Sequence, residues 1–90
     1  QTFLVGFKAE YNISDSNIIK GAYRKLKECK GDLIVANDVG RKNSAIGSEN
    51  NEVFLIDKHR NILHLPPQNK MSIARKLLDV IENLITHNKL

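Results

Sequence analysis

The sequence predicts an α/β fold built from a parallel β-α-β unit, a β-hairpin and a C-terminal helix. Two short apolar runs, residues 3–7 and 32–37, are each expected to form a buried strand, and they flank a segment whose apolar residues recur at helical spacing. Two further strand patterns then surround a turn, and a long amphipathic helical pattern closes the chain. We therefore expect about four strands and two helices in these 90 residues.

The β-α-β unit has local signals for each of its parts. Residues 14–16 offer side-chain oxygens that cap a helix N-terminus, and Gly31 is expected to end the helix, which we place near residues 15–30. Its apolar face would consist of Ile18, Ile19, Ala22, Leu26 and Cys29. The run 32–37 is nearly all apolar, which is typical of a strand buried on both faces of a parallel sheet.

The second half of the chain predicts a hairpin and a helix. Residues 52–56 and 61–65 form two strand patterns around the turn 57–60, and Pro66 and Pro67 are expected to break the chain. Asn69 or Ser72 could cap the last helix. Its apolar stripe is Ile73, Leu77, Val80, Ile81, Leu84 and Ile85. The polar stretch 38–51 has no periodicity, so we expect a loop, with residues 40–49 mobile in the absence of a ligand.

Composition narrows the class of protein. Hydrophobic residues make up 41% of the chain, which suits a globular domain, and no apolar run approaches the roughly 20 residues that span a bilayer. The single cysteine allows no internal disulfide, so we expect a cytoplasmic location. The net charge of +4 suits a phosphorylated ligand, nucleic acid or anionic lipid, although the cations are scattered. With five aromatic residues and no interleaving of basic and aromatic positions, we expect no nucleic acid partner and no membrane partner.

The candidate ligand site lies at the ends of the first two strands. Ligands of open parallel sheets bind at the carboxyl ends of the strands, which here are residues 6–10 and 36–40. Gly6 would let a ligand approach the backbone, Phe7 offers a flat face, and Asn37 offers a donor and an acceptor. Spacing alone leaves open whether Phe7 is a ligand contact or a core residue.

Other familiar chemistry is not indicated. The chain has no glycine-rich phosphate loop and no serine or cysteine nucleophile arrangement. The three histidines, His59, His64 and His87, lack metal-ligand spacing, so we expect no metal held by this chain alone.

Several segments resemble the phosphopantothenate–cysteine ligase family. They are VGFKAE at 5–10, AYRKL at 22–26, DLIVANDV at 32–39 and GSENNEV at 47–53, followed by Leu65-Pro66, Lys70 and the helix 74–84. Their order and spacing are similar to the C-terminal portion of that family over nearly the whole chain. The string DLIVANDV after a helix ending in Lys-Gly is the most specific piece.

The resemblance implies a Rossmann-like three-layer fold, of which residues 1–90 would be the C-terminal part. It implies a ligase that joins 4′-phosphopantothenate to cysteine through an acyl-cytidylate, using CTP with Mg²⁺ and releasing CMP and pyrophosphate. Members of the family form homodimers, and many are fused to a decarboxylase domain that carries FMN. Because the first residue is Gln1 and the family's N-terminal half of the domain has no counterpart here, we expect a fragment that is inactive alone.

The resemblance also assigns residues. The catalytic positions would be Lys25 and Asn37. The nucleotide-binding positions would be Gly6, Phe7, Lys8, Ala9, Asn37, Asp38, Ile46 and Lys70. Lys8 stands where many members have alanine, and Ile46 where they have an aromatic residue. Two alternatives stay open, namely a non-catalytic module that binds a nucleotide or phosphorylated ligand, and a small basic nucleic-acid-binding domain.

Overall fold

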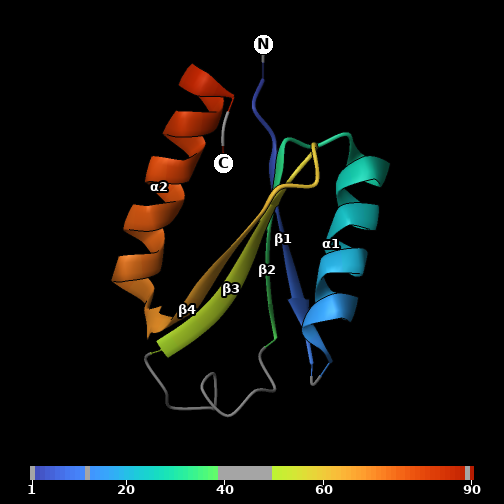
Figure 1. Ribbon diagram of the computed structural model, residues 1–90, viewed down its shortest axis with the longest axis vertical. Coiled ribbons are helices and arrows are strands. Elements are labelled where there is room, and N and C mark those ends of the chain that lie inside the picture. The colour runs from blue at the N-terminus through green and yellow to red at the C-terminus, as the bar shows by residue number, and fades with distance from the viewer. Residues whose placement is uncertain (1, 12, 39–49, 89) are drawn as a thin grey trace.

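The structure, a computed structural model, describes residues 2–11, 13–38, 50–88 and 90. Its elements are β1 (Val5–Glu10), α1 (Asp15–Cys29), β2 (Leu33–Asp38), β3 (Asn50–Asp57), β4 (Ile62–Asn69) and α2 (Lys70–His87), as Figure 1 shows. The predicted α/β class and the order of strands and helices are confirmed. Neither helix in these described ranges is long and apolar enough to cross a membrane.

The four strands form one mixed sheet in the order β1-β2-β3-β4. β1 and β2 are parallel, with Phe7 opposite Val35 and Ala9 opposite Asn37, while β2–β3 and β3–β4 are antiparallel. The prediction that the two apolar runs form adjacent parallel strands joined by a helix is therefore confirmed.

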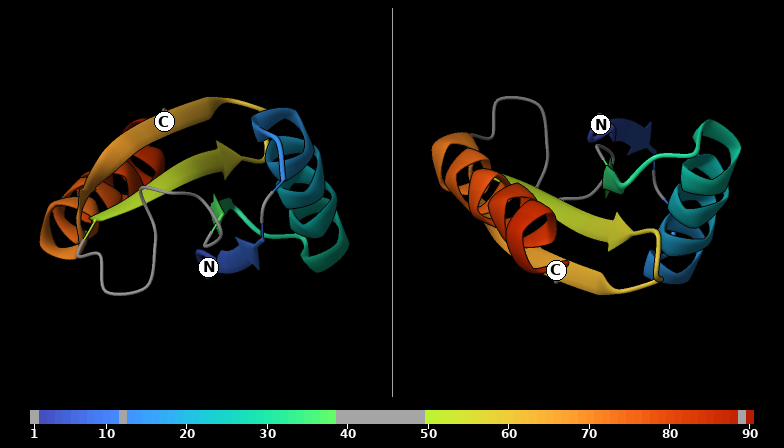
Figure 2. Two further views of the ribbon diagram at one scale, coloured as in Figure 1. Left: turned by 90° about the horizontal axis from the view of Figure 1, so that it is seen from below. Right: turned by 90° about the horizontal axis from the view of Figure 1, so that it is seen from above.

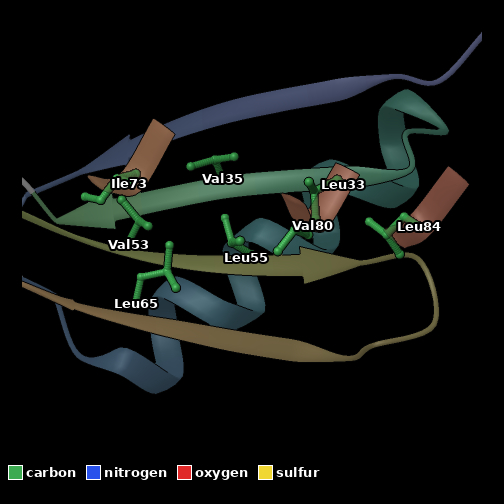
Figure 3. Close-up of a cluster of buried hydrophobic side chains, with 8 residues drawn as sticks. All are labelled: Leu33, Val35, Val53, Leu55, Leu65, Ile73, Val80 and Leu84. Atoms are coloured by element: carbon green, nitrogen blue, oxygen red, sulfur yellow. The ribbon is translucent and has the colours of Figure 1, made fainter. Parts of the chain in front are cut away.

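The helices lie on opposite faces of the sheet and make three layers (Figures 1 and 2). Alternate residues of β2 and β3 supply both cores, because successive side chains of a strand point to opposite faces. The core under α1 contains Ile18, Ala22, Leu26, Ile34, Ala36, Phe54 and Ile56. The core under α2 contains Leu33, Val35, Val53, Leu55, Leu65, Ile73, Val80 and Leu84 (Figure 3). This double burial explains the continuous apolar run in β2.

β1 is an edge strand of this sheet and is only partly covered. Val5 packs against the core under α2, but Phe7 is 68% exposed and Leu4 41% exposed. The expectation of a buried first strand over residues 3–7 is wrong in its bounds and in its burial. The strand runs from Val5 to Glu10, and α2 packs on β3 and β4 instead of on β1.

The two prolines do not break the chain as predicted, because β4 continues through them to Asn69. The pairing with β3 passes from Leu65 opposite Val53 to Gln68 opposite Asn51, so β4 carries one extra residue there. Proline lacks an N–H group and is tolerated at a bulge on an edge strand, where no second neighbour needs that donor. β4 meets both conditions.

The helix ends follow local side-chain chemistry. The N-cap of α1 is Ser14, whose hydroxyl accepts a hydrogen bond from Asn17 N–H at 3.2 Å. The N-cap of α2 is Asn69 rather than Ser72. α1 ends at Cys29, and its C-cap is Lys30, with φ of 53° in the left-handed region, one residue before the Gly31 that was expected to end the helix.

Candidate functional site

The carboxyl ends of β1, β2 and β4 and the first turns of both helices lie at one end of the molecule, the lower end in Figure 1. Ala9 pairs with Asn37 and Glu10 with Asp38, so the two predicted strand-end segments are neighbours. Residues 40–49, expected to form a mobile loop, lie outside the described residues.

Three predicted residues form a continuous surface that we call the strand-end face: Phe7, Ala9 and Asn37. All three point to the α2 side of the sheet, because Phe7 pairs with Val35 of that core and positions two apart share a face. With 68% of its surface exposed, Phe7 is not a core residue of the described chain, and its contact with a ligand stays a prediction. The strand-end face thus presents an aromatic ring beside a partly buried amide.

Gly6 and Lys8 lie on the opposite side of β1, towards α1. The Lys8 ammonium forms an ion pair with Glu10 at 2.7 Å, and a Cβ atom added at Gly21 would lie 3.2 Å from Lys8 Cε. Glu10 was not among the predicted residues, although the alternation of β1 places positions 6, 8 and 10 on one face. The backbone of Lys8 is therefore part of the strand-end face, whereas its side chain lies on the opposite side of β1.

Lys25 stands one turn after Gly21 on the same flank of α1, so it faces the side of the molecule that holds Lys8. Its side chain is exposed. Lys25 lies ten positions after the helix start at Asp15, which is roughly 15 Å along the axis at 1.5 Å per residue. Lys25 therefore lies on the α1 side of the molecule and is not brought to the strand-end face.

Gly6 has a packing role of its own. A Cβ atom at this position would lie 2.7 Å from Cδ1 of Ile34, which is fully buried under α1. Close approach of a neighbouring side chain, rather than of a ligand, is sufficient to require glycine here. Its predicted contact with a nucleotide stays a prediction.

Asp38 is 2% exposed and accepts a hydrogen bond from Ile13 N–H at 2.6 Å. The carboxylate thus holds the connection between β1 and α1 against the end of β2. This contact gives Asp38 a structural role, and nucleotide binding by its side chain stays a prediction.

The remaining two predicted residues are not brought to the strand-end face. Lys70 is the exposed first residue of α2 and follows β4, three strand spacings from β1, or roughly 14 Å. Ile46 lies outside the described residues. Within the described part of the chain, no three His, Cys, Asp or Glu side chains gather as a metal site.

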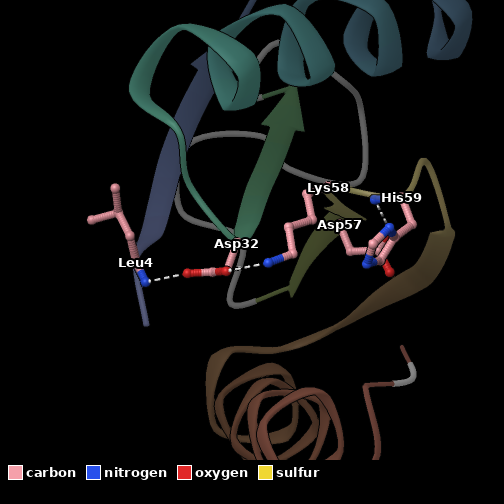
Figure 4. A network of polar contacts seen from close by, with 5 residues as sticks. All are labelled: Leu4, Asp32, Asp57, Lys58 and His59. Carbon is pink, nitrogen blue, oxygen red and sulfur yellow. Dashed lines mark hydrogen bonds and ion pairs between the residues drawn. The ribbon is translucent and has the colours of Figure 1, made fainter. Parts of the chain in front are cut away.

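A polar network closes the opposite end of the sheet (Figure 4). The Asp32 carboxylate accepts hydrogen bonds from Leu4 N–H at 2.8 Å and from the Lys58 ammonium at 3.2 Å. The backbone N–H of Leu4, with Lys58 as a further cause, lowers the pKa of Asp32 from its ordinary value. Nearby, Asp57 accepts from His59 N–H at 2.9 Å, which fixes the β3–β4 turn.

The three layers and the open surface at the carboxyl ends of parallel strands place the chain among open-sheet α/β proteins, whose ligands bind at that end. Over residues 1–85 the chain matches the family described as DNA/pantothenate metabolism flavoprotein C-terminal domain, and it belongs to that family.

Its curated relatives include the coenzyme A biosynthesis bifunctional protein CoaBC of Thermococcus kodakarensis, 39% identical over 83 residues. The CoaBC protein of Methanocaldococcus jannaschii is 27% identical over 82 residues. These alignments cover 92% and 91% of this chain but 19% of each relative. The chain therefore spans about a fifth of the length of these relatives.

Solved structures agree with this assignment. The C-terminal domain of a coenzyme A biosynthesis bifunctional protein CoaBC superposes with a TM-score of 0.70 at 30% identity, over 93% of this chain and 35% of that chain. The DNA/pantothenate metabolism flavoprotein of Streptococcus pneumoniae superposes with a TM-score of 0.74 at 24% identity, over 89% and 32%. At 24% identity, the likeness to the Streptococcus pneumoniae protein shows the fold alone. The resemblance to the ligase portion of these proteins is confirmed at the level of the family.

Proposed function

We propose that this chain supplies part of the nucleotide site of a phosphopantothenate–cysteine ligase that acts in coenzyme A biosynthesis. The names of the matched relatives support the pathway, and the family match supports the portion of the protein. Because the chain spans 19% of those relatives, the proposal assigns the remaining substrate contacts to residues outside it. FMN, in this proposal, belongs to the decarboxylase portion of a bifunctional protein.

The proposed reaction has two steps. The carboxylate of 4′-phosphopantothenate attacks the α-phosphate of CTP, which forms an acyl-cytidylate and releases pyrophosphate; Mg²⁺ would supply positive charge to the phosphates. The amine of cysteine then attacks the acyl carbon and releases CMP. This chain would bind and orient the nucleotide and offset the charge that builds up on the departing pyrophosphate.

The division of β1 into two sides suggests how the nucleotide is held. Phe7 and Asn37 would contact the nucleoside on the strand-end face, and the backbone of Lys8 and Ala9 would pass beneath it. Lys25, on the α1 side of the molecule, would approach the phosphates as a mobile point charge. Lys70 lies apart from this set, because the width of the sheet separates it from Phe7.

The exposure of Phe7 is the observation that carries this assignment. A large aromatic side chain inside a parallel edge strand is left 68% exposed, two residues before Ala9, which lies opposite Asn37 near the carboxyl ends, where sheets of this class bind ligands. Replacing the ring with alanine in the full-length protein should raise the KM for CTP about tenfold or more, since stacking on a base contributes roughly 1–3 kcal/mol. Phe7→Tyr should retain most of the affinity.

Leu78→Ala is the matched control, because Leu78 is 67% exposed on α2 away from the strand ends. An unchanged KM for CTP in a folded Phe7→Ala protein would show that the nucleoside does not bind at the strand-end face. The alternative of a non-catalytic binding module makes a separate claim. It predicts CTP binding without pyrophosphate release or a ligated product when 4′-phosphopantothenate, cysteine and Mg²⁺ are supplied.

A further inference from the structure

A basic groove lies on the flank of α1 that faces away from Gly21 and Lys25. It consists of two adjoining pockets that share Tyr23 and Lys27, with volumes of about 580 and 240 Å³. The larger pocket lies between α1 and the pair Ile56 and Ile62, which flank the turn of the β3–β4 hairpin. We call the two pockets together the α1–hairpin groove. It is separated from the strand-end face by α1 and the sheet.

The lining of the α1–hairpin groove has one sign of charge. Six cationic residues line it: Lys20, Arg24, Lys27, Lys30, Lys58 and Arg60. No Asp or Glu is among the lining residues in the described part of the chain. Of the six, Lys58 contacts Asp32 at 3.2 Å outside the groove. Cations gathered in a concave surface favour an anion in it and raise the anion's local concentration.

Arg60 is held in place from two directions. Its guanidinium lies 4.4 Å from the centroid of the Tyr23 ring, which Lys27 also approaches at 5.8 Å. Its backbone is in the left-handed region, with φ of 67°, and Asp57 accepts hydrogen bonds from the N–H groups of His59 and Asn61 on either side of it. A stacked guanidinium keeps its in-plane donors for a phosphate or carboxylate group. The groove thus has an arginine whose position is fixed and whose in-plane donors have no hydrogen-bond partner in the described part of the chain.

The floor of the groove is apolar. Ile19, Ile56 and Ile62 line the larger pocket, and Ile62 is 47% exposed. A volume of about 580 Å³ lies within the range of roughly 300–1,000 Å³ that is usual for small-molecule sites. A bare inorganic anion would leave this floor in contact with water, so the floor favours an organic ligand that also carries negative charge.

Charge density favours phosphate over the carboxylates of an acidic peptide. A phosphate monoester carries up to two charges and several acceptor oxygens on one atom, whereas carboxylates on a peptide carry one charge each at separate residues. A nucleic acid is disfavoured because Tyr23 is the single aromatic residue lining the groove in the described part of the chain, and Arg60 already stacks on it.

We propose that the α1–hairpin groove is a second binding site, separate from the nucleotide site, for a small organic molecule that carries a phosphate group. Arg60, Arg24 and Lys27 contact the phosphate, and Ile19 and Ile62 contact the apolar part. An occupant of this groove bridges α1 to the β3–β4 hairpin. The proposal does not depend on the ligase assignment.

The test uses phenyl phosphate, which combines a phosphate with an apolar ring, titrated into the full chain while its NMR resonances are followed. We expect saturable shifts at Tyr23, Arg60 and Ile62, with inorganic phosphate binding at least tenfold more weakly. Arg60→Gln should weaken phenyl phosphate about tenfold or more, because it removes a charge-assisted contact. Arg75→Gln, an exposed arginine of α2, is the matched control and should leave the affinity unchanged.

Arg60→Gly controls for misfolding, because glycine accepts the positive φ at this position and lacks the guanidinium. This variant should fold, and it should bind phenyl phosphate as weakly as Arg60→Gln does. Equal weakening by Arg75→Gln would mean general electrostatic attraction and would overturn the proposal. Saturable shifts at Phe7 and Asn37 instead of at Tyr23 would assign the probe to the strand-end face and also overturn it. The proposal would also be overturned if a hexaglutamate peptide or a single-stranded oligonucleotide binds at Tyr23 and phenyl phosphate does not.

Discussion

Gly6 shows how a single residue can be fixed by its neighbour rather than by a ligand. Because Cδ1 of the buried Ile34 would lie 2.7 Å from a new Cβ, we expect Gly6→Ala to destabilise the protein by about 1–3 kcal/mol through overpacking. Ile34→Val removes the clashing methyl group and alone should cost about 0.5–1.5 kcal/mol. In the double variant the two costs should not add, which urea denaturation of all four proteins measures. Additive costs would contradict the proposed packing role of Gly6.

Asp32 gives the fold a pH dependence with a definite sign. The hydrogen bond from Leu4 N–H, and then Lys58, lower the pKa of this carboxyl in the folded state. A lowered folded pKa contributes stability that is present above the unfolded pKa of about 3.9 and is lost as the pH falls through the folded value. The free energy of unfolding should therefore fall with decreasing pH below about pH 4, and fall less steeply in Asp32→Asn.

The measurement for Asp32 is urea denaturation at a series of acidic pH values. Asp79→Asn, an exposed carboxylate on α2, controls for the change in net charge. If Asp79→Asn and Asp32→Asn flatten the pH dependence equally, net charge and not the contact with Leu4 is the cause.

At the scale of the elements, the sequence predicted what local patterns determine. The helical spacing of Ile18, Ala22 and Leu26 and the continuous apolar run in β2 gave the β-α-β unit, and the parallel register then brought Ala9 beside Asn37. The tolerance of Pro66 and Pro67 was missed, because it depends on whether a strand has one neighbour or two. That information comes from the assembled sheet.

The β3–β4 turn depends on the buried carboxylate of Asp57, which is 1% exposed. It accepts hydrogen bonds from His59 N–H and from both Asn61 N–H and Asn61 Nδ2. Asp57→Ala should destabilise the protein by about 1–3 kcal/mol, because partly buried donors are left unsatisfied. It should also disturb the Tyr23 ring resonances, since the turn positions Arg60 over that ring.

Asp57→Asn keeps an acceptor oxygen for the turn and is the matched comparison. We expect it to cost less than Asp57→Ala in urea denaturation and to leave the Tyr23 resonances closer to those of the native protein. Equal losses in the two variants would show that the charge of Asp57, rather than its hydrogen bonds to the turn, stabilises the hairpin.

At the scale of the whole molecule, strand alternation separates neighbouring site residues onto opposite faces, but the sequence did not show which helix covers which face. Phe7 and Lys8 are adjacent in the chain, yet β1 directs the first to the α2 side and the second to the α1 side. The α1–hairpin groove was missed altogether, because Tyr23 and Arg60 belong to separate segments and meet only in the folded chain. The exposure of Phe7 likewise follows from β1 being an edge strand.

Lys25 tests whether the two sides of β1 serve one nucleotide. In the proposed reaction its ammonium offsets charge on pyrophosphate as that group leaves, so its loss should affect the first step most. Losing a charge-assisted hydrogen bond costs roughly 1.5–3 kcal/mol, and each 1.4 kcal/mol is a factor of ten in rate. Lys25→Ala in the full-length protein should therefore slow formation of the acyl-cytidylate about ten- to a hundredfold. Attack by cysteine should slow less, because pyrophosphate has already departed.

Rapid-quench measurement of the two half-reactions checks this expectation for Lys25. Lys76→Ala, an exposed lysine on α2, is the matched control and should leave both rates unchanged. Equal slowing of both steps by Lys25→Ala, or no effect on either, would mean that Lys25 is a surface residue. The phosphates would then have to be held elsewhere, and the β1 edge would separate the strand-end face from α1 in function as well as in structure.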